Sequence, residues 1–320
     1  MKETDLLVEP LLQELEAGYD GLHVVALGGG HGLAGALKAI LGYADSITAV
    51  VSVADDGGSS GRLAPALSIP PPGDIRRALL ALSPEQSVWR RLIEFRFEGA
   101  DVAGHSLGNL IIAALTELSG SFEDALHTVG RLLGARGAVV PAAIVPLVLE
   151  AEVDGELVRG QVAIARSRGK ITDLRVLPEG THATHAAGAA LRSAGQIVLG
   201  PGSLFTSVIA GLKVPGIADA VNESAGRLVY VCNLTTQDGE TLGMDGKDHL
   251  DALAGFGGIR MPDAVVVHDG PLRVPDGLTP VRLAHGDADM VVAAGDIVDP
   301  EAAWPQHDPA RLGAILRRLA

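Results

Sequence analysis

The sequence contains one cysteine, Cys232, among 320 residues. A single cysteine excludes an intrachain disulfide framework and a cysteine-rich zinc module, and its place in the apolar run 228–232 predicts a buried core residue in a reducing setting. Long apolar runs are also lacking: none approaches the roughly 18 residues that a membrane span requires. The acidic N-terminus has neither the basic start nor the apolar stretch of a signal peptide. We therefore expect a cytoplasmic protein that does not insert into a membrane.

Positive charge is scarce. Lys and Arg number 25 against 39 Asp and Glu, which gives a formal net charge of −14. This balance argues against electrostatic binding to nucleic acid or to an anionic membrane, so an anionic ligand would have to be held by local groups. The length fits about two domains of roughly 150 residues each, or one large α/β domain with an inserted module.

Short apolar runs typical of strands alternate with helical patterns along most of the chain. The first such unit places a helix over 33–41 between strands at 22–27 and 47–53. The same alternation returns in the second half, with strands predicted at 196–199, 228–232 and 264–267 and helices near 183–194, from Asp248 and over 309–319. The pattern predicts a Rossmann-like, doubly wound, mostly parallel α/β sheet, whose ligands bind beyond the carboxyl ends of the strands.

At residues 139–178 the alternation of strands and helices is interrupted by consecutive runs of the strand type. Asp154-Gly155 stands between two alternating runs, which is a hairpin signal, so we expect a small antiparallel β subdomain there. The chain then divides into an N-terminal extension (1–20), a Rossmann-like first half (21–138), the antiparallel subdomain and a second half of the α/β core (179–320). Residues 54–85 are rich in Gly, Ser and Pro and are expected to form a long functional loop.

The first predicted strand runs into a glycine-rich segment, and residues 30–35 match the dinucleotide-binding pattern GxGxxG between a strand and a helix. Such glycines let the backbone approach a ligand, and the helix N-terminus offers N–H groups to a phosphate. The next strand leads to Asp55 and Asp56, at the spacing of a ribose-binding carboxylate, which favours an NAD enzyme. These carboxylates are followed directly by residues 57–62, a second loop suited to binding an anion, which nicotinamide binding does not require.

The serine-hydrolase pattern GxSxG occurs twice, at 57–61 and 104–108. A nucleophile elbow has to follow a buried strand directly, and neither segment does. We expect no basic partner for Ser59 or Ser106 and interpret Ser106 as the N-cap of a helix over 107–118. Ser121 is likewise expected to cap the helix 122–133.

Two further polar segments follow predicted strands. Residues 200–207 repeat the order of strand, glycine turn, hydroxyl and helix, which indicates a third phosphate or sugar contact. Residues 233–241 bring donors and acceptors to the point where a ligand of such a sheet would lie.

Taken in order, VALGGGHGL, VSVADDGGSSGRL, PPGDIRRALLAL, GHSLGNLIIAAL, GPGSLFTSVI and VYVCNLTTQDGET resemble the YvcK family of bacterial gluconeogenesis factors, within the CofD-like superfamily. The resemblance extends from about Val24 to beyond His268. It implies a Rossmann-like core, binding of a UDP-sugar such as UDP-N-acetylglucosamine or UDP-glucose, and a role linking carbon metabolism to cell-wall synthesis and cell shape. The CofD relatives, 2-phospho-L-lactate transferases, move a phospholactate group from a nucleotide-linked donor.

Residue-by-residue matching to these motifs assigns ligand-binding roles to Gly28, Gly29, Gly30, His31, Gly32, Asp55, Asp56, Gly57, Gly58, Ser59, Ser60, Gly73, Asp74, Arg76, His105, Asn109, Gly202, Ser203, Thr206, Asn233, Thr235, Gln237 and Glu240. The family often has an aromatic residue shortly after this last segment, where this chain has Leu242 and Met244. An aromatic stack on a uracil is therefore lacking at that position, although Met can cover a ring more loosely.

Two functions fit these residues. The first is a non-catalytic regulator that binds a UDP-sugar or a related nucleotide diphosphate and needs no metal. The second is a phosphotransferase in which Asp55 or Asp56 holds Mg²⁺ or activates an acceptor hydroxyl, while Arg76 neutralises phosphate. The sequence decides neither turnover nor homo-oligomerisation.

Overall fold

The computed structural model describes residues 21–283 and 290–320. The predicted N-terminal extension, 1–20, lies outside the described residues. Except at residues 291–295, the strands of the central sheet form where apolar, often β-branched runs are buried on both faces, as expected for the interior of a parallel sheet. The central sheet has seven strands in the order β10-β9-β8-β7-β1-β2-β3, and every neighbouring pair is parallel. The strands are β1 (His23–Gly28), β2 (Ser46–Val51), β3 (Ala138–Pro141), β7 (Gln196–Leu199), β8 (Arg227–Val231), β9 (Ala264–His268) and β10 (Val291–Gly295).

The order of the strands creates a switch point between β1 and β7. From β1 the chain builds outward through β2 and β3 on one side, and from β7 through β8, β9 and β10 on the other. Leu27 in β1 lies opposite Val50 of β2 and Leu199 of β7. Connections leave the carboxyl ends of β1 and β7 in opposite directions, which opens the crevice in which such sheets bind ligands. The predicted doubly wound α/β class is confirmed.

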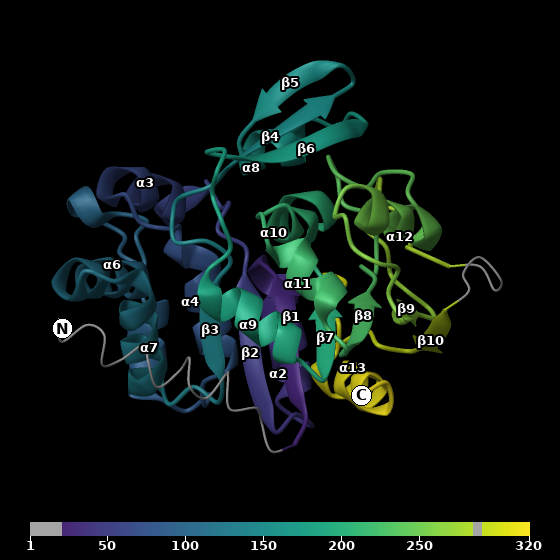
Figure 1. Ribbon diagram of the computed structural model, residues 1–320, viewed down its shortest axis with the longest axis horizontal. Helices are drawn as coiled ribbons and strands as arrows, with labels where there is room; N and C mark the ends of the chain where they lie inside the picture. Colours follow the sequence, from purple (N-terminus) through teal and green to yellow (C-terminus); the bar gives the residue numbers. More distant parts are fainter. Residues whose placement is uncertain (1–20, 284–289) are drawn as a thin grey trace.

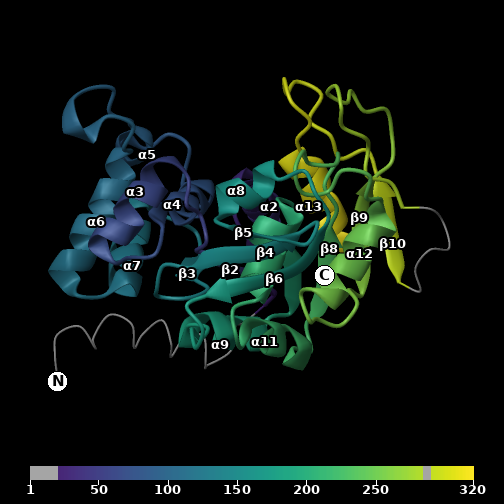
Figure 2. The same cartoon turned by 90° about the horizontal axis from the view of Figure 1, so that it is seen from above.

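Helices cover both faces of the sheet (Figures 1 and 2). On one face lie α2 (Gly30–Ile40) and α13 (Pro309–Arg318), and on the other α9 (His185–Ser193) and α11 (Ile217–Glu223). Helix α2 buries Leu33, Leu37 and Ile40, which recur at helical spacing on the side that faces the sheet. The helix 309–319 is confirmed as α13, and the helix near 183–194 as α9.

A group of helices lies beside β3, at the left of Figures 1 and 2. It comprises α3 (Gly58–Leu67), α4 (Pro72–Ala81), α5 (Val88–Glu94), η1 (Ala100–Val102), α6 (Leu107–Ser119) and α7 (Phe122–Leu133). The expectation that 54–85 forms one long loop is wrong. Pro72 starts α4 at a position where its missing N–H costs nothing, and Ile75, Ala78 and Leu79 then recur at helical spacing and are buried.

The antiparallel unit lies above the parallel sheet in Figure 1. Its strands are β4 (Val148–Val153), β5 (Glu156–Arg159) and β6 (Ile171–Leu177), and their order in the sheet is β5-β4-β6. Helix α8 (Gln161–Arg166) connects β5 to β6. The predicted hairpin is confirmed: Asp154 and Gly155 both have left-handed backbone angles, with φ of 51° and 84°. Residues 139–141 were expected to belong to this unit, but they form β3 of the parallel sheet because they pair with β2.

The predicted caps are largely confirmed. The side chains of Ser106 and Ser121 accept hydrogen bonds from the backbone of Asn109 and Asp124 and so begin α6 and α7. The helix expected from Asp248 is α12 (Gly246–Gly255) and begins two residues earlier, because Asp245 and Asp248 form a capping box.

No single helix in the described part of the chain is long and apolar enough to cross a membrane. One pair of helices, Leu204–Leu212 and Ile217–Glu223, meets the length and composition of a span only when taken together, and the pair is bent by 74°. Its first member consists of η2 (Leu204–Ile209), a π-helix, and α10 (Ala210–Leu212), and all of its residues are buried in the fold.

Candidate functional site

A polar cavity of about 280 Å³ lies at the carboxyl ends of β1, β2 and β7. Its position is the crevice that the strand order creates. The lining residues are Gly29, Gly30, His31, Gly32, Ser52, Asp55, Asp74, Arg77, Gln161, Gly202, Ser203, Thr206, Ser207 and Gln237.

The first turn of α2 forms one wall of this cavity. Gly29 is the N-cap and provides no side-chain cap, and Gly30 has a left-handed φ of 64°. First-turn N–H groups have no preceding turn to bond to, so they can bind a ligand anion, helped by the positive end of the helix dipole. One of them is already used: the N–H of Gly30 donates to Asp74 Oδ2 at 2.8 Å. The N–H groups of His31 and Gly32 are the next two in the first turn of the helix.

Two carboxylates and one guanidinium give the cavity its charge. Asp74, in α4, forms an ion pair with Arg77 one turn further along the same helix. Burial raises the pKa of Asp74 above its ordinary value, and the negative charge of Asp55 adds to this increase, while Arg77 and the N–H of Gly30 oppose it. Desolvation and the nearby guanidinium groups of Arg77 and Arg76 lower the pKa of His31. The ring of His31 is therefore neutral at pH 7.

Asp55 and Asp56 are adjacent in sequence but have different surroundings. Asp55 lines the cavity, and one of its oxygens accepts a hydrogen bond from the N–H of Gly57 at 3.0 Å. Asp56 does not line the cavity; its Oδ1 accepts from the N–H of Val162 in the first turn of α8, at 3.0 Å. Asp56 thus attaches the antiparallel unit to the loop after β2.

The loop after β7 packs tightly against α2. A Cβ on Gly32 would lie 2.2 Å from the carbonyl oxygen of Pro201, so only glycine fits there. Asn233 braces the same loop, because its Oδ1 accepts from the N–H of Gly202 at 3.0 Å and its Nδ2 donates to the Gly202 carbonyl at 2.8 Å. Asn233 therefore shapes the cavity from outside the lining.

At the N-terminus of η2, where a phosphate or sugar contact is expected, several donors already bond to Glu240. The carboxylate of Glu240 accepts from the N–H groups of Phe205 and Thr206, at 3.1 and 3.2 Å, and from the Thr206 hydroxyl at 2.6 Å. Burial raises the pKa of Glu240, and these hydrogen bonds oppose the increase. The donors that were assigned to a ligand anion are thus occupied by a side chain of the protein itself.

Ser59 has an imidazole partner, contrary to the expectation from the sequence. Its hydroxyl lies 3.0 Å from Nδ1 of His105 and also accepts from Nδ2 of Asn109 at 3.0 Å, while Asn109 accepts from Nε of Arg76 at 3.0 Å. The four residues come from α3, α4 and α6 and the turn before α6, so no local spacing signals the pairing. Burial and the guanidinium groups of Arg62 and Arg96 lower the pKa of His105, which makes it a weaker base.

Ser60 and Gly73 extend this buried cluster, because the N–H of Gly73 donates to Ser60 Oγ at 3.0 Å. A Cβ on Gly73 would meet Ser60 Oγ at 2.3 Å and Asp55 Oδ2 at 3.0 Å, so the cluster lies directly behind the cavity. Ser59, Ser60, Gly73, Arg76, His105 and Asn109 therefore hold α3, α4 and α6 together and do not line the cavity.

Ten of the sequence-predicted site residues meet in the cavity: Gly29, Gly30, His31, Gly32, Asp55, Asp74, Gly202, Ser203, Thr206 and Gln237. Gly28, Gly57 and Gly58 lie in the adjacent backbone, and Thr235 lines a different cavity that shares Gln237. Sequence reasoning missed Ser52, Arg77, Gln161 and Ser207. Ser52 and Arg77 stand within motifs that were recognised, whereas Gln161 comes from the antiparallel unit and had no signal of its own.

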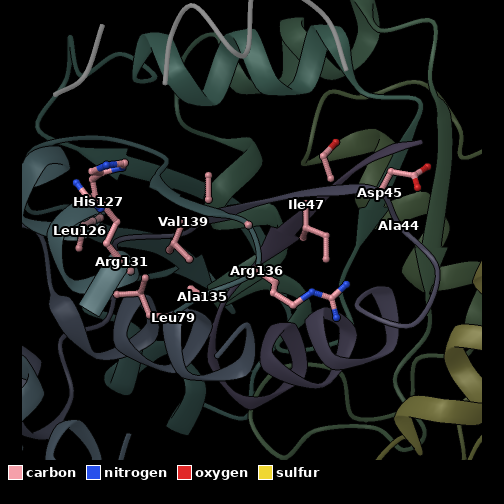
Figure 3. A pocket seen from close by; sticks show the side chains of 14 residues that line it. Ala44, Asp45, Ile47, Leu79, Leu126, His127, Arg131, Ala135, Arg136 and Val139 are labelled. Carbon is pink, nitrogen blue, oxygen red and sulfur yellow. The ribbon is translucent and has the colours of Figure 1, made fainter. Parts of the chain in front are cut away.

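A second cavity, of about 420 Å³, lies at the opposite edge of the sheet and is shown in Figure 3. Its walls include the first residues of β2 and β3 and the end of α7, with His127 and Arg131 on one side and Asp45 on the other. This edge carries the amino ends of the strands, where sheets of this type do not bind their ligands. The cavity at the switch point remains the candidate site.

Comparisons with known proteins agree with this fold. Residues 24–289 match the family model described as 2-phospho-L-lactate transferase CofD. A gluconeogenesis factor of Halalkalibacterium halodurans is 43% identical over 252 residues, which is 78% of each chain. The gluconeogenesis factor of Bacillus subtilis is 42% identical over 247 residues, or 77% of this chain and 78% of the relative. The crystal structure of a UPF0052 family member from Bacillus halodurans superposes with a TM-score of 0.87, at 37% identity, over 93% of this chain and all of that one.

The fold and the matched residues thus define a CofD-like protein. Within that group, the chain belongs to the gluconeogenesis-factor family.

Proposed function

We propose that the protein binds a nucleotide-diphosphate sugar of the UDP class in the cavity at the switch point and acts as a regulator that links carbon metabolism to cell-wall synthesis and cell shape. Membership of the gluconeogenesis-factor family supports the metabolic part of this proposal. The observation that carries the binding part is the first turn of α2, where the N–H groups of His31 and Gly32 face a lining rich in hydroxyl and amide groups.

The lining fits the two halves of such a ligand. A diphosphate binds the N–H groups of His31 and Gly32. The positive end of the helix dipole attracts it there, although the net charge of the chain is negative. Sugar hydroxyls find acceptors in Asp55 and in the side chains of Ser203 and Gln237. Asp55 keeps one oxygen for the ligand because its other oxygen is held by Gly57.

Thermal unfolding with a panel of nucleotides tests the proposal. UDP-N-acetylglucosamine or UDP-glucose should stabilise the protein, and NADH should not. A ligand at 100 times its Kd adds about 2.7 kcal/mol of stability, which corresponds to a rise in Tm of several degrees. Equal shifts with NADH, or no shift with any UDP-sugar, would refute the assignment.

A second function is favoured by one specific observation, the presence of two carboxylates in the same cavity. Magnesium commonly uses one or two carboxylates together with substrate phosphates, so Asp55 and Asp74 fit an ion delivered with a nucleotide. In that case the protein is a transferase of phosphorus-containing groups. Magnesium-dependent consumption of a nucleotide-linked phosphate donor, with a detected product, identifies this alternative.

A further inference from the structure

Trp304 is one of two tryptophans in the chain, and its side chain is 59% exposed. The other, Trp89, lies in α5, within the helical group beside β3. Exposure of a large aromatic side chain forgoes the stabilisation that its burial would give, so its position is informative when it faces a cavity. Trp304 also lies after residues 24–289, so the family match assigns it no role.

The segment that carries Trp304 is anchored at the carboxyl edge of the sheet by contacts of its two ends. Val298 and His307 pair as an antiparallel bridge, and the N–H of Asp299 donates to the carbonyl of Gln306 at 2.9 Å. The Nε2 of His307, which is partly buried, lies 3.1 Å from the carbonyl oxygen of Cys232. Trp304 is therefore presented by a closed loop that is anchored directly after β8.

A cavity of about 570 Å³ lies between this loop and residues 235–238. Trp304 and Leu242 provide apolar surface, while Thr235, Thr236 and Asp238 provide polar groups. Such a combination of one flat aromatic face with hydrogen-bonding groups around it suits a planar heterocycle.

Gln237 connects this cavity with the candidate site, because it lines both. Its side chain is held from two directions: Nε2 donates to Ser203 Oγ at 3.3 Å, and Oε1 accepts from Nδ2 of Asn233 at 3.3 Å. A ligand that extends past Gln237 from the first turn of α2 therefore enters the cavity beneath Trp304.

We propose that Trp304 stacks on the nucleobase of the bound nucleoside diphosphate, whose phosphates lie on α2. This inference rests on the proposed function and adds the base subsite to it. Stacking tolerates any base, so Trp304 contributes affinity for the nucleoside, while neighbouring polar groups select the base. The loop that carries the ring is anchored by contacts within the protein, which limits the ordering that binding must impose.

Trp89→Phe gives a protein in which Trp304 is the only indole and provides the first test. Titration of this variant with UDP-N-acetylglucosamine should change the intrinsic fluorescence with the same Kd that calorimetry measures. Saturating binding with no change in fluorescence would overturn the inference, since a base stacked on the indole alters its emission.

Trp304→Ala and Trp304→Phe provide the second test. The alanine variant should bind UDP-N-acetylglucosamine about 5- to 150-fold more weakly, the range for losing one base–aromatic stack, and the phenylalanine variant should recover most of this loss. N-acetylglucosamine 1-phosphate, which lacks the nucleoside, should bind the wild type and Trp304→Ala equally. If the wild type binds UDP-sugars and Trp304→Ala binds them as well, the base subsite is refuted while the proposed function stands. If the wild type binds no nucleotide sugar, the proposed function fails, and the subsite fails with it.

Discussion

Asp74 Oδ2 accepts a hydrogen bond from the backbone N–H of Gly30 at 2.8 Å and so joins the first turn of α4 to the first turn of α2. The two residues are 44 positions apart and belong to different motifs of the sequence. Through this contact, the glycine loop and the PGDIR segment form one wall of the cavity. A substitution in either motif therefore affects the position of the other.

Gly32 and Gly35 lie in the same helix and provide a matched pair for testing how tightly the glycine loop packs. Gly32→Ala places a Cβ 2.2 Å from the Pro201 carbonyl and should lower the free energy of unfolding by about 1–3 kcal/mol. Gly35→Ala meets nothing within 4 Å and should raise it by about 0.5–1 kcal/mol. Urea unfolding of both variants checks this, and equal stabilities would contradict the packing argument. Gly32 is thus expected to contribute to the stability of the fold through its contact with the loop after β7.

Asp55→Asn and Asp56→Asn should separate the cavity carboxylate from its neighbour. Asp55→Asn should weaken UDP-sugar binding by about 1–3 kcal/mol, because a charge-assisted hydrogen bond to a ligand hydroxyl is lost. Asp56→Asn should leave affinity nearly unchanged, since an asparagine oxygen can still accept from Val162. Calorimetry with and without Mg²⁺ measures both. Loss of a magnesium-dependent turnover in Asp55→Asn would instead favour the transferase.

Glu240→Ala should destabilise the fold by about 2–4 kcal/mol. The substitution removes three hydrogen bonds at once and leaves the buried N–H groups of Phe205 and Thr206 without their acceptor. Glu223→Ala is a suitable control, because it removes only an exposed ion pair with Arg192 and should cost at most about 1 kcal/mol. Denaturant unfolding of the two variants compares them. Similar losses would mean that the Glu240 cap contributes little.

Fluorophosphonate probes should label neither Ser59 nor Ser106. Ser59 does have an imidazole beside it, but His105 has a lowered pKa and Ser59 is buried, and Ser106 is used as a helix cap. Mass spectrometry of the treated protein, with a known serine hydrolase as positive control, checks the prediction. Stoichiometric labelling that disappears in Ser59→Ala would restore the hydrolase hypothesis.

The stability of the protein should decrease as the pH falls below about 6.5. Burial lowers the pKa of His307 to about 4, so the unfolded chain binds a proton at this position more readily than the folded chain does. Stability from this residue is complete above the unfolded pKa and is lost towards pH 4, by about 2 kcal/mol between pH 7 and pH 5. Urea unfolding at the two pH values should show a smaller difference for His307→Gln than for the wild type. His185→Gln, at the exposed start of α9, should keep the wild-type difference.

The sequence predicted those parts of the fold that are encoded locally. Strand 22–27 and the helix that follows it, the Asp154-Gly155 hairpin and the Ser106 cap all depend on spacing over a few residues, and each is confirmed. Residues 54–85 were misjudged because glycine, serine and proline suggest a loop, whereas tertiary packing of Ile75 and Leu79 stabilises helices there.

The site was predictable in its loops but not in its individual contacts. Parallel strands bring the segments after β1, β2 and β7 together, and this follows from the sheet alone. Whether a polar side chain then faces the ligand or its own protein depends on long-range partners. Glu240 and Asn233 turn to the loop after β7, and Asp56 turns to α8, through contacts that span 31 to 106 residues.

The antiparallel unit begins and ends at the same place, since Val148 is paired with Leu177 across β4 and β6. The segment between these two residues, which includes Gln161, could therefore be replaced without a change in the strand order of the seven-stranded sheet. Such an exchange would replace Gln161, the one residue of this unit in the cavity lining, and leave the glycine loop intact. The lining of the cavity at this point can thus be changed by replacing a thirty-residue segment, while the first turn of α2 stays the same.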